Sequence, residues 1–157
     1  MFLMWERLKA ALGRLSLARQ DPQQDLESNG NIGRTDLALA GESAPPIDLA
    51  HALERMGGDR QLFSDVIHVF LEDGPGQLAA IKAAVDARDA DAIRRTAHAL
   101  KGASGNLAAT DVFEAAQTLE RLGAERRLDA AEAGWRRLSA AAAQLLDTLR
   151  RIERTPV

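Results

Sequence analysis

The sequence predicts an all-α protein, an antiparallel up-and-down four-helix bundle with a short extra helix at its N-terminal end. First, alanine and leucine dominate a chain of 157 residues that is 46% apolar, 4% aromatic and free of tyrosine, and this composition favours helices over sheets. Second, from residue 47 onward apolar residues recur at the three- and four-residue spacing of helices, with no competing strand pattern. Third, the connections between these segments are short, which favours antiparallel neighbours.

The N-terminal part of the chain is predicted to lie outside the bundle. Residues 1–18 can form a short amphipathic helix, because three leucines recur at helical spacing. That helix is either unattached or the end of an upstream unit, or else it docks on a membrane surface or a partner. Residues 19–46 are rich in Gln, Asn, Gly, Ser, Asp and Pro and lack periodicity, which predicts a flexible linker. The bundle domain is then expected over residues 47–152, with residues 153–157 as a tail.

The first half of the bundle contains clear stop and start signals. A short helix after the proline pair is expected to end at Gly57-Gly58. Asp59 can cap a second helix with a broad apolar face. The stretch "EDGPG" interrupts that helix, because Pro75 has no amide hydrogen and suits the first turn of a new helix or a kink. The apolar pattern then continues to about Arg88.

Three further helices follow. Asp89 or Asp91 is expected to start the next helix. Asp111 with Glu114 three residues later can form a capping box for the helix after it. Asp129 is expected to cap a long last helix, whose apolar residues alternate between four- and three-residue spacing, as in the seam of a bundle. These residues are Trp135, Leu138, Ala142, Leu145, Leu149 and Ile152.

Charge and composition exclude several classes of function. The formal net charge is -3 and charges of both signs are interleaved, so the chain has no basic stripe for nucleic acid. There is no cysteine, which excludes disulfides and thiolate chemistry. No apolar run approaches the ~20 residues that span a bilayer, and charges directly follow the apolar opening "MFLMW", the wrong order for a signal peptide. We therefore expect a cytoplasmic protein without a membrane span. We also expect it to be a monomer.

The stretch "AHALKGASGNLAA", residues 97–109, contains the candidate site. On a helix that turns ~100° per residue, an apolar stripe that includes Ile93 and Leu100 forms the core face. His98 lies about 140° from Ile93, clearly outside that stripe, so it is predicted to face solvent. Arg94 and Lys101 lie on the same side of the helix as His98.

Two glycines in this helix call for an explanation. Gly102 and Gly105 each cost ~1 kcal/mol relative to alanine in a helix. Their lack of side chains beside His98 would clear the approach for another surface. We therefore expect docking at Gly102 and Gly105, with Met56 and Phe63 as exposed apolar docking residues on the first two helices.

An outward-facing imidazole at this position suits the chemistry of a phosphate carrier. A neutral imidazole nitrogen is a good nucleophile near neutral pH, and Lys101 and Arg94 can stabilise the negative charge of a phosphoryl group on His98. The sequence leaves open that His98 is an exposed histidine without a role. A metal site is disfavoured, because zinc would require another ligand three or four residues away, where the chain has Lys101 and Gly102.

The stretch "RRTAHALKGASGNLAA" resembles the active-site helix of histidine-containing phosphotransfer (HPt) domains, the four-helix phosphorelay intermediates of two-component signalling. The resemblance extends over about residues 47–152 through "DLAHALERMGGDRQLFSDVIHVFLED" and "AAQTLERLGAERRLDAA". It implies that His98 is phosphorylated and that Lys101 neutralises the phosphoryl group or the acidic pocket of an incoming receiver domain. It also implies that the two glycines leave room for docking. Ala108 departs from the family, which often has glycine there, and this bears on how the helix ends.

The resemblance implies a phosphorelay intermediate. It would accept a phosphoryl group from a receiver-domain aspartate or a kinase and pass it to a response-regulator aspartate. The chain is not expected to be an enzyme, because it has no glycine-rich nucleotide loop and no room for a kinase domain. Its partners would be a receiver domain and a sensor histidine kinase, which could be hybrid. It would need no cofactor, since the partner receiver would hold any magnesium. The alternative is a non-transferring module that regulates a receiver or an enzyme by docking.

Overall fold

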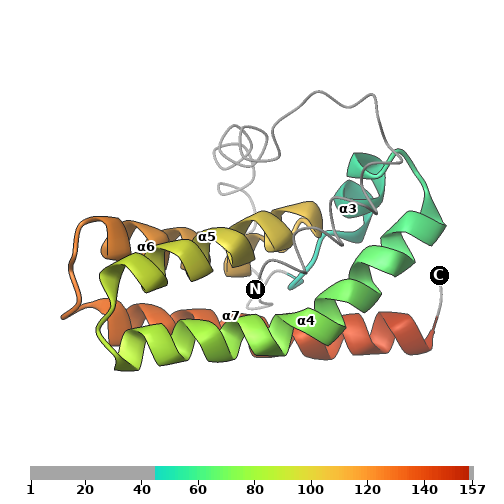
Figure 1. Ribbon diagram of the computed structural model, residues 1–157. Coiled ribbons are helices and arrows are strands. Elements are labelled where there is room, and N and C mark those ends of the chain that lie inside the picture. Colours follow the sequence, from blue (N-terminus) through green and yellow to red (C-terminus); the bar gives the residue numbers. More distant parts are fainter. Residues whose placement is uncertain (1–44, 156–157) are drawn as a thin grey trace, which may run out of the picture.

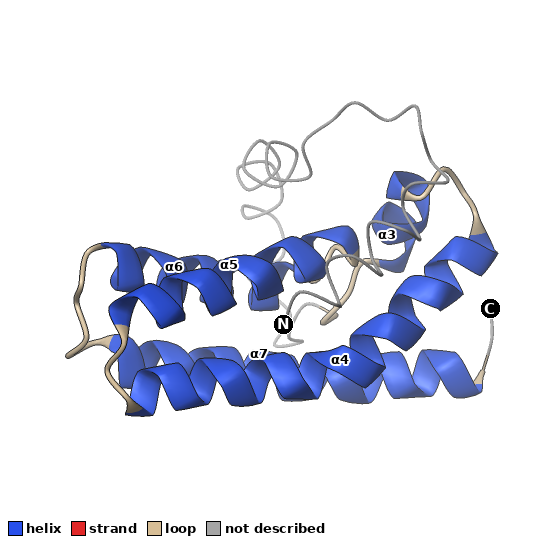
Figure 2. Cartoon of the chain, viewed as in Figure 1, coloured by secondary structure: helices blue, strands red, loops and turns tan. Residues whose placement is uncertain are grey.

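The computed structural model describes residues 45–155, which form five helices and no strand (Figures 1 and 2). The predicted all-α class is confirmed for this part of the chain. The expected helix over residues 1–18 and nearly all of the expected linker lie outside the described residues, so those domain boundaries stay predictions. The helices are α3 (Leu49–Arg55), α4 (Arg60–Asp86), α5 (Ala90–Asn106), α6 (Thr110–Ala124) and α7 (Ala131–Arg154).

The four longer helices form a closed bundle. Each packs against its neighbour in the chain, and α4 also packs against α7, so the first and last helices of the bundle meet. In Figure 1, α5 and α6 lie over α4 and α7, and α3 lies near the start of α4. The core is built from the apolar stripes of all four helices. Its largest fully buried side chains include Val66, Ile81, Ile93, Leu100, Leu119, Leu138, Leu145 and Leu149.

Two of the predicted helix caps are confirmed. The side chain of Asp59 accepts a hydrogen bond from the amide of Leu62 at 3.0 Å and caps α4. Asp89 caps α5 in the same way, through the amide of Ala92 at 2.9 Å, and Asp91 lies inside the first turn. Such caps satisfy amides that have no partner within the helix and contribute ~1 kcal/mol each.

The predicted caps of the last two helices are wrong. Residue Ala109 caps α6 without a side-chain hydrogen bond, because a tight backbone turn after α5 starts α6 earlier than expected. Asp111 therefore lies within the first turn and forms no capping box. A backbone turn also precedes α7, whose cap is Ala130, one residue after the expected Asp129.

Helix α4 is continuous over 27 residues, so of the two alternatives at "EDGPG" the start of a new helix is wrong and the kink is the one that fits. Pro75 lies inside the helix, and α4 bends along its length in Figure 1, as the missing amide hydrogen and the proline ring favour. Beside it, Gly74 is buried, and a Cβ there would lie 3.3 Å from Phe70 and 3.7 Å from Leu146 of α7. Close packing of α4 on α7 thus holds this part of the helix in place.

The three turns that join α4 through α7 have the same backbone conformation. In each, the residue after the helix cap has a left-handed conformation, and the next amide bonds back to a carbonyl five residues earlier. Ala108, the residue that departs from the resemblance, is the left-handed residue after α5. The left-handed residues are Arg88 (φ 53°), Ala108 (φ 50°) and Arg126 (φ 55°).

Candidate functional site

His98 lies at the surface of α5, as the helical periodicity predicts. Its side chain is 58% exposed, whereas Ala97 and Leu100 beside it in the sequence are buried in the core. Ser104 is completely buried, and its hydroxyl donates to the carbonyls of Leu100 and Lys101 within the same helix. Ser104 therefore lies in the core, whereas His98 lies on the exposed face of the same helix.

A carboxylate that the sequence analysis missed connects this surface to the next helix. Oε1 of Glu120, on α6, lies 2.7 Å from Nδ1 of His98. Its other oxygen, Oε2, lies 2.7 Å from Nζ of Lys101. Glu120 thus bridges two residues of α5. It is 22 residues from His98 in the chain, so spacing within one helix could not reveal it.

The position of Lys101 corrects the expectation of an open cation beside His98. Only 11% of its side chain is exposed, because α6 covers it and its ammonium group forms an ion pair with Glu120. Burial of the Glu120 carboxyl works to raise its pKa, but the hydrogen bonds from Lys101 and His98 outweigh that effect and hold the pKa below its ordinary value. Glu120 is therefore a stable anion at neutral pH, and it cancels the charge of Lys101 locally.

The contact with Glu120 decides which nitrogen of His98 is available. A carboxylate accepts hydrogen bonds and has no hydrogen to donate, so the hydrogen lies on Nδ1 of His98. In the neutral imidazole, Nε2 then has a free lone pair. The site can therefore present Nε2 as a nucleophile, and the carboxylate can stabilise positive charge that develops on the ring.

A polar cleft of about 510 Å³ runs between α5 and α6 beside these residues. Its lining includes Arg94 and Lys101 from α5 and Glu120 and Arg121 from α6. The two helices approach closely at Gly123. A Cβ there would lie 2.7 Å from the carbonyl oxygen of Ala90 and 2.8 Å from the amide nitrogen of Arg94. The missing side chain of Gly123 therefore fixes the separation of the cleft walls.

Two of the expected docking residues are not at the surface. Met56 is 1% exposed and belongs to the core, so its predicted exposure is wrong. Met56 directly follows α3, whose seven residues are too few for periodicity to define a buried face well. Gly105 is buried as well, which corrects the expectation that it opens the surface beside His98, whereas Gly102 is half-buried.

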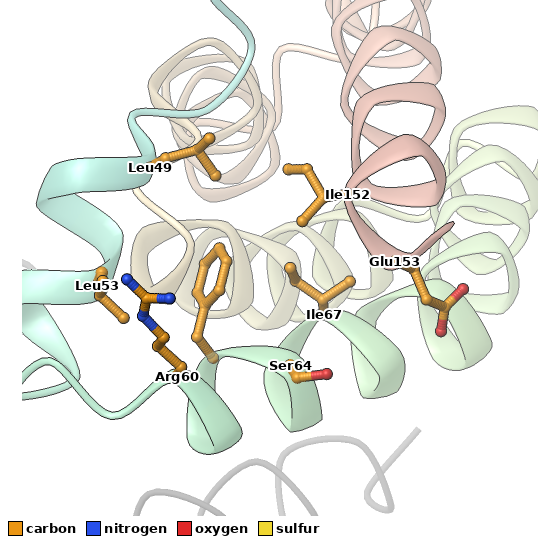
Figure 3. Close-up of a pocket in the computed structure, with 8 residues that line it drawn as sticks. Leu49, Leu53, Arg60, Ser64, Ile67, Ile152 and Glu153 are labelled. Carbon is orange, nitrogen blue, oxygen red and sulfur yellow. The ribbon is translucent and has the colours of Figure 1, made fainter. Parts of the chain in front are cut away.

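Phe63, the remaining docking candidate, is half-buried and lines a second, apolar pocket of about 130 Å³. Figure 3 shows this pocket between Leu49 and Leu53 of α3 and, facing them, Ile67 of α4 and Ile152 of α7. Leu49 is 40% exposed, so apolar surface remains open to solvent here. The pocket lies where α3, the start of α4 and the end of α7 meet, whereas the cleft follows the α5–α6 pair.

Within residues 45–155, no group of three or more His, Cys, Asp or Glu side chains is arranged to hold a metal ion. In the same range, every helix is too short or too polar to cross a membrane.

Comparison with known proteins gives two findings. The family model of the Hpt domain matches residues 65–154, a range that contains both His98 and Glu120. The crystal structure of histidine-containing phosphotransfer protein B (HptB) from Pseudomonas aeruginosa PAO1 is similar to the chain, with a TM-score of 0.66 and 25% sequence identity. That match covers 71% of this chain and 97% of HptB. No curated protein sequence matches the chain.

Proposed function

The chain belongs to the Hpt domain family, whose members carry out histidine phosphotransfer in two-component signalling, and on that premise we propose that His98 is the residue that is phosphorylated. The observation that supports this most is the contact between Nδ1 and Glu120, which leaves Nε2 of an exposed ring free to react. We propose that the protein accepts a phosphoryl group from a receiver-domain aspartate or a kinase and passes it to a response-regulator aspartate. In this proposal it acts as a phosphoryl carrier and not as a kinase.

The proposed transfer needs little from this chain beyond a positioned nucleophile. Nε2 of His98 forms a bond to the phosphorus of an aspartyl phosphate while the bond from phosphorus to the aspartate oxygen breaks. The ring keeps its hydrogen on Nδ1, and the resulting positive charge is offset by Glu120. The chain supplies no cofactor, and any magnesium belongs to the receiver domain. The proposed working unit is a cytoplasmic monomer.

Lys101 acts in this proposal as a positioning residue. Its ammonium group contacts Glu120, so it orients the carboxylate that in turn orients the imidazole. This role differs from direct neutralisation of the phosphoryl group. Docking of the partner at the half-buried Gly102 and Phe63 stays a prediction.

Phosphoramidate, a small phosphoryl donor, tests His98 without any partner protein. We expect an acid-labile, alkali-stable label on the wild-type protein and none on His98→Gln. The matched control is His68→Gln, which removes another exposed histidine, on α4, and is expected to label normally. Label that persists in His98→Gln would overturn the assignment.

A second measurement separates transfer from docking alone. Incubation with a panel of phosphorylated receiver domains is expected to move label onto the wild-type protein and not onto His98→Gln. Tight binding of a receiver that survives His98→Gln, with no label on the wild-type protein, would favour the non-transferring alternative.

A further inference from the structure

Two arginines in the cleft beside His98 have charge that the described part of the chain does not neutralise. Arg94 of α5 and Arg121 of α6 both line this cleft and are exposed. Within residues 45–155, neither makes an ion pair or a side-chain hydrogen bond. Lys101 differs from them, because Glu120 holds its ammonium group at 2.7 Å.

The charge of the cleft is therefore opposite to that of the chain as a whole. Its lining has three cations, Arg94, Lys101 and Arg121, and one carboxylate, Glu120, so the positive excess is two charges. The whole chain has a formal net charge of -3. A local positive region on an acidic protein attracts acidic groups and repels basic ones, and it speeds the encounter with a partner of opposite charge.

The backbone places both arginines next to the reactive ring. Arg94 lies one helical turn before His98, and its amide is packed against α6 at Gly123. Arg121 directly follows Glu120, whose carboxylate contacts His98. Nε2 is the ring nitrogen that does not contact Glu120, so a phosphoryl group on Nε2 does not displace this carboxylate.

We propose that this cleft binds acidic side chains of the protein that docks over His98, and that Arg94 and Arg121 thereby select the partner by charge. An arginine guanidinium binds a carboxylate through two parallel hydrogen bonds, which adds direction to the attraction. This inference rests on the proposed function, since it concerns the partner in that reaction. It assigns the partner an acidic patch beside its phosphorylated aspartate.

Charge reversal in the cleft tests the proposal. Arg94→Glu, Arg121→Glu and the double variant are compared with Arg150→Glu, which reverses an exposed arginine on α7 outside the cleft. The probe is the receiver domain that transfers fastest to the wild-type protein. At low salt we expect the double variant to accept phosphoryl groups from it at least about tenfold more slowly, and added salt to shrink the difference. Arg150→Glu is expected to match the wild type.

A parallel series with phosphoramidate distinguishes this proposal from the assignment of His98. The loss caused by the arginine variants is expected to be much larger with the receiver than with phosphoramidate. Equal losses with both donors would overturn the proposal, because the arginines would then serve the phosphoryl group itself. Transfer from the receiver at the wild-type rate would also overturn it. If neither donor labels the wild-type protein, the proposed function is contradicted. Calorimetry would then compare the binding of the same receiver domains to the wild type and to the arginine variants.

Discussion

The α5–α6 cleft differs in its interactions from the apolar pocket that α3, the start of α4 and the end of α7 form. In the cleft, one carboxylate, Glu120, joins two residues of the facing helix through contacts of 2.7 Å. In the pocket, apolar side chains from three helices meet, from the buried Ile67 to the exposed Leu49. The pocket therefore depends on buried area, whereas the cleft depends on the position of a few charged atoms.

This difference indicates that the stability of the fold and the reactivity of His98 can be changed separately. Loss of apolar volume at the pocket should weaken the fold and spare the chemistry of His98. Loss of Glu120 should affect both, because the same carboxylate orients the imidazole and neutralises a buried ammonium group. Two substitutions and a change of pH test this difference, and they follow in order of decreasing expected effect.

The largest effect is expected from Ile67→Ala, which leaves a cavity where a side chain only 2% exposed now packs. We expect the free energy of unfolding to fall by about 2–5 kcal/mol, measured by urea denaturation. Ile67→Val, which removes a single methylene group, should cost about 0.5–1.5 kcal/mol. The folded fraction of Ile67→Ala should label with phosphoramidate as the wild type does. A selective loss of labelling would show that the two regions are coupled.

Glu120→Ala should have the next largest effect on stability. It leaves Lys101 largely buried without its partner, which is expected to cost about 1–3 kcal/mol in the free energy of unfolding. The matched control is Glu114→Ala, on the same helix, which removes a longer and more exposed ion pair with Arg137 and should cost less than about 1 kcal/mol. Labelling of His98 should slow in Glu120→Ala alone. If both variants behave alike, the bridge has no special role.

The smallest effect is expected from acid. The pKa of Glu120 is lower in the folded protein than its ordinary value of 4.5, so its ionised form stabilises the fold above that pH, and the contribution is lost as pH falls through the folded-state pKa. The difference in unfolding free energy between the wild type and Glu120→Gln should therefore narrow below about pH 4.5. Urea denaturation at a series of pH values measures it. A difference that stays constant down to pH 2 would contradict the lowered pKa.

Periodicity predicted the features that belong to a single helix. The core stripe of α5 and the exposure of His98 follow from an angle of ~100° per residue, because packing against the bundle keeps that regular geometry. Periodicity gave no information about contacts between helices. A helical wheel gives the direction of Lys101, and it contains no information that α6 covers that side chain or that Glu120 lies opposite.

The errors near the helix ends have a similar cause. Asp111 and Asp129 have the side chains of good caps, but the backbone turns before α6 and α7 determine where those helices begin. Met56 directly follows a seven-residue helix, and its burial reflects how that helix packs rather than its own sequence pattern. Sequence signals at such ends compete with tertiary packing, and here packing decided the outcome.

The turns between the bundle helices have a consequence for engineering. Left-handed backbone costs a residue with a side chain roughly 1 kcal/mol, a strain that glycine avoids. This chain places alanine or arginine at all three left-handed positions, 88, 108 and 126. Glycine at these three positions should therefore raise the free energy of unfolding. The fold could therefore be stabilised through its turns, with His98, Lys101 and Glu120 left unchanged.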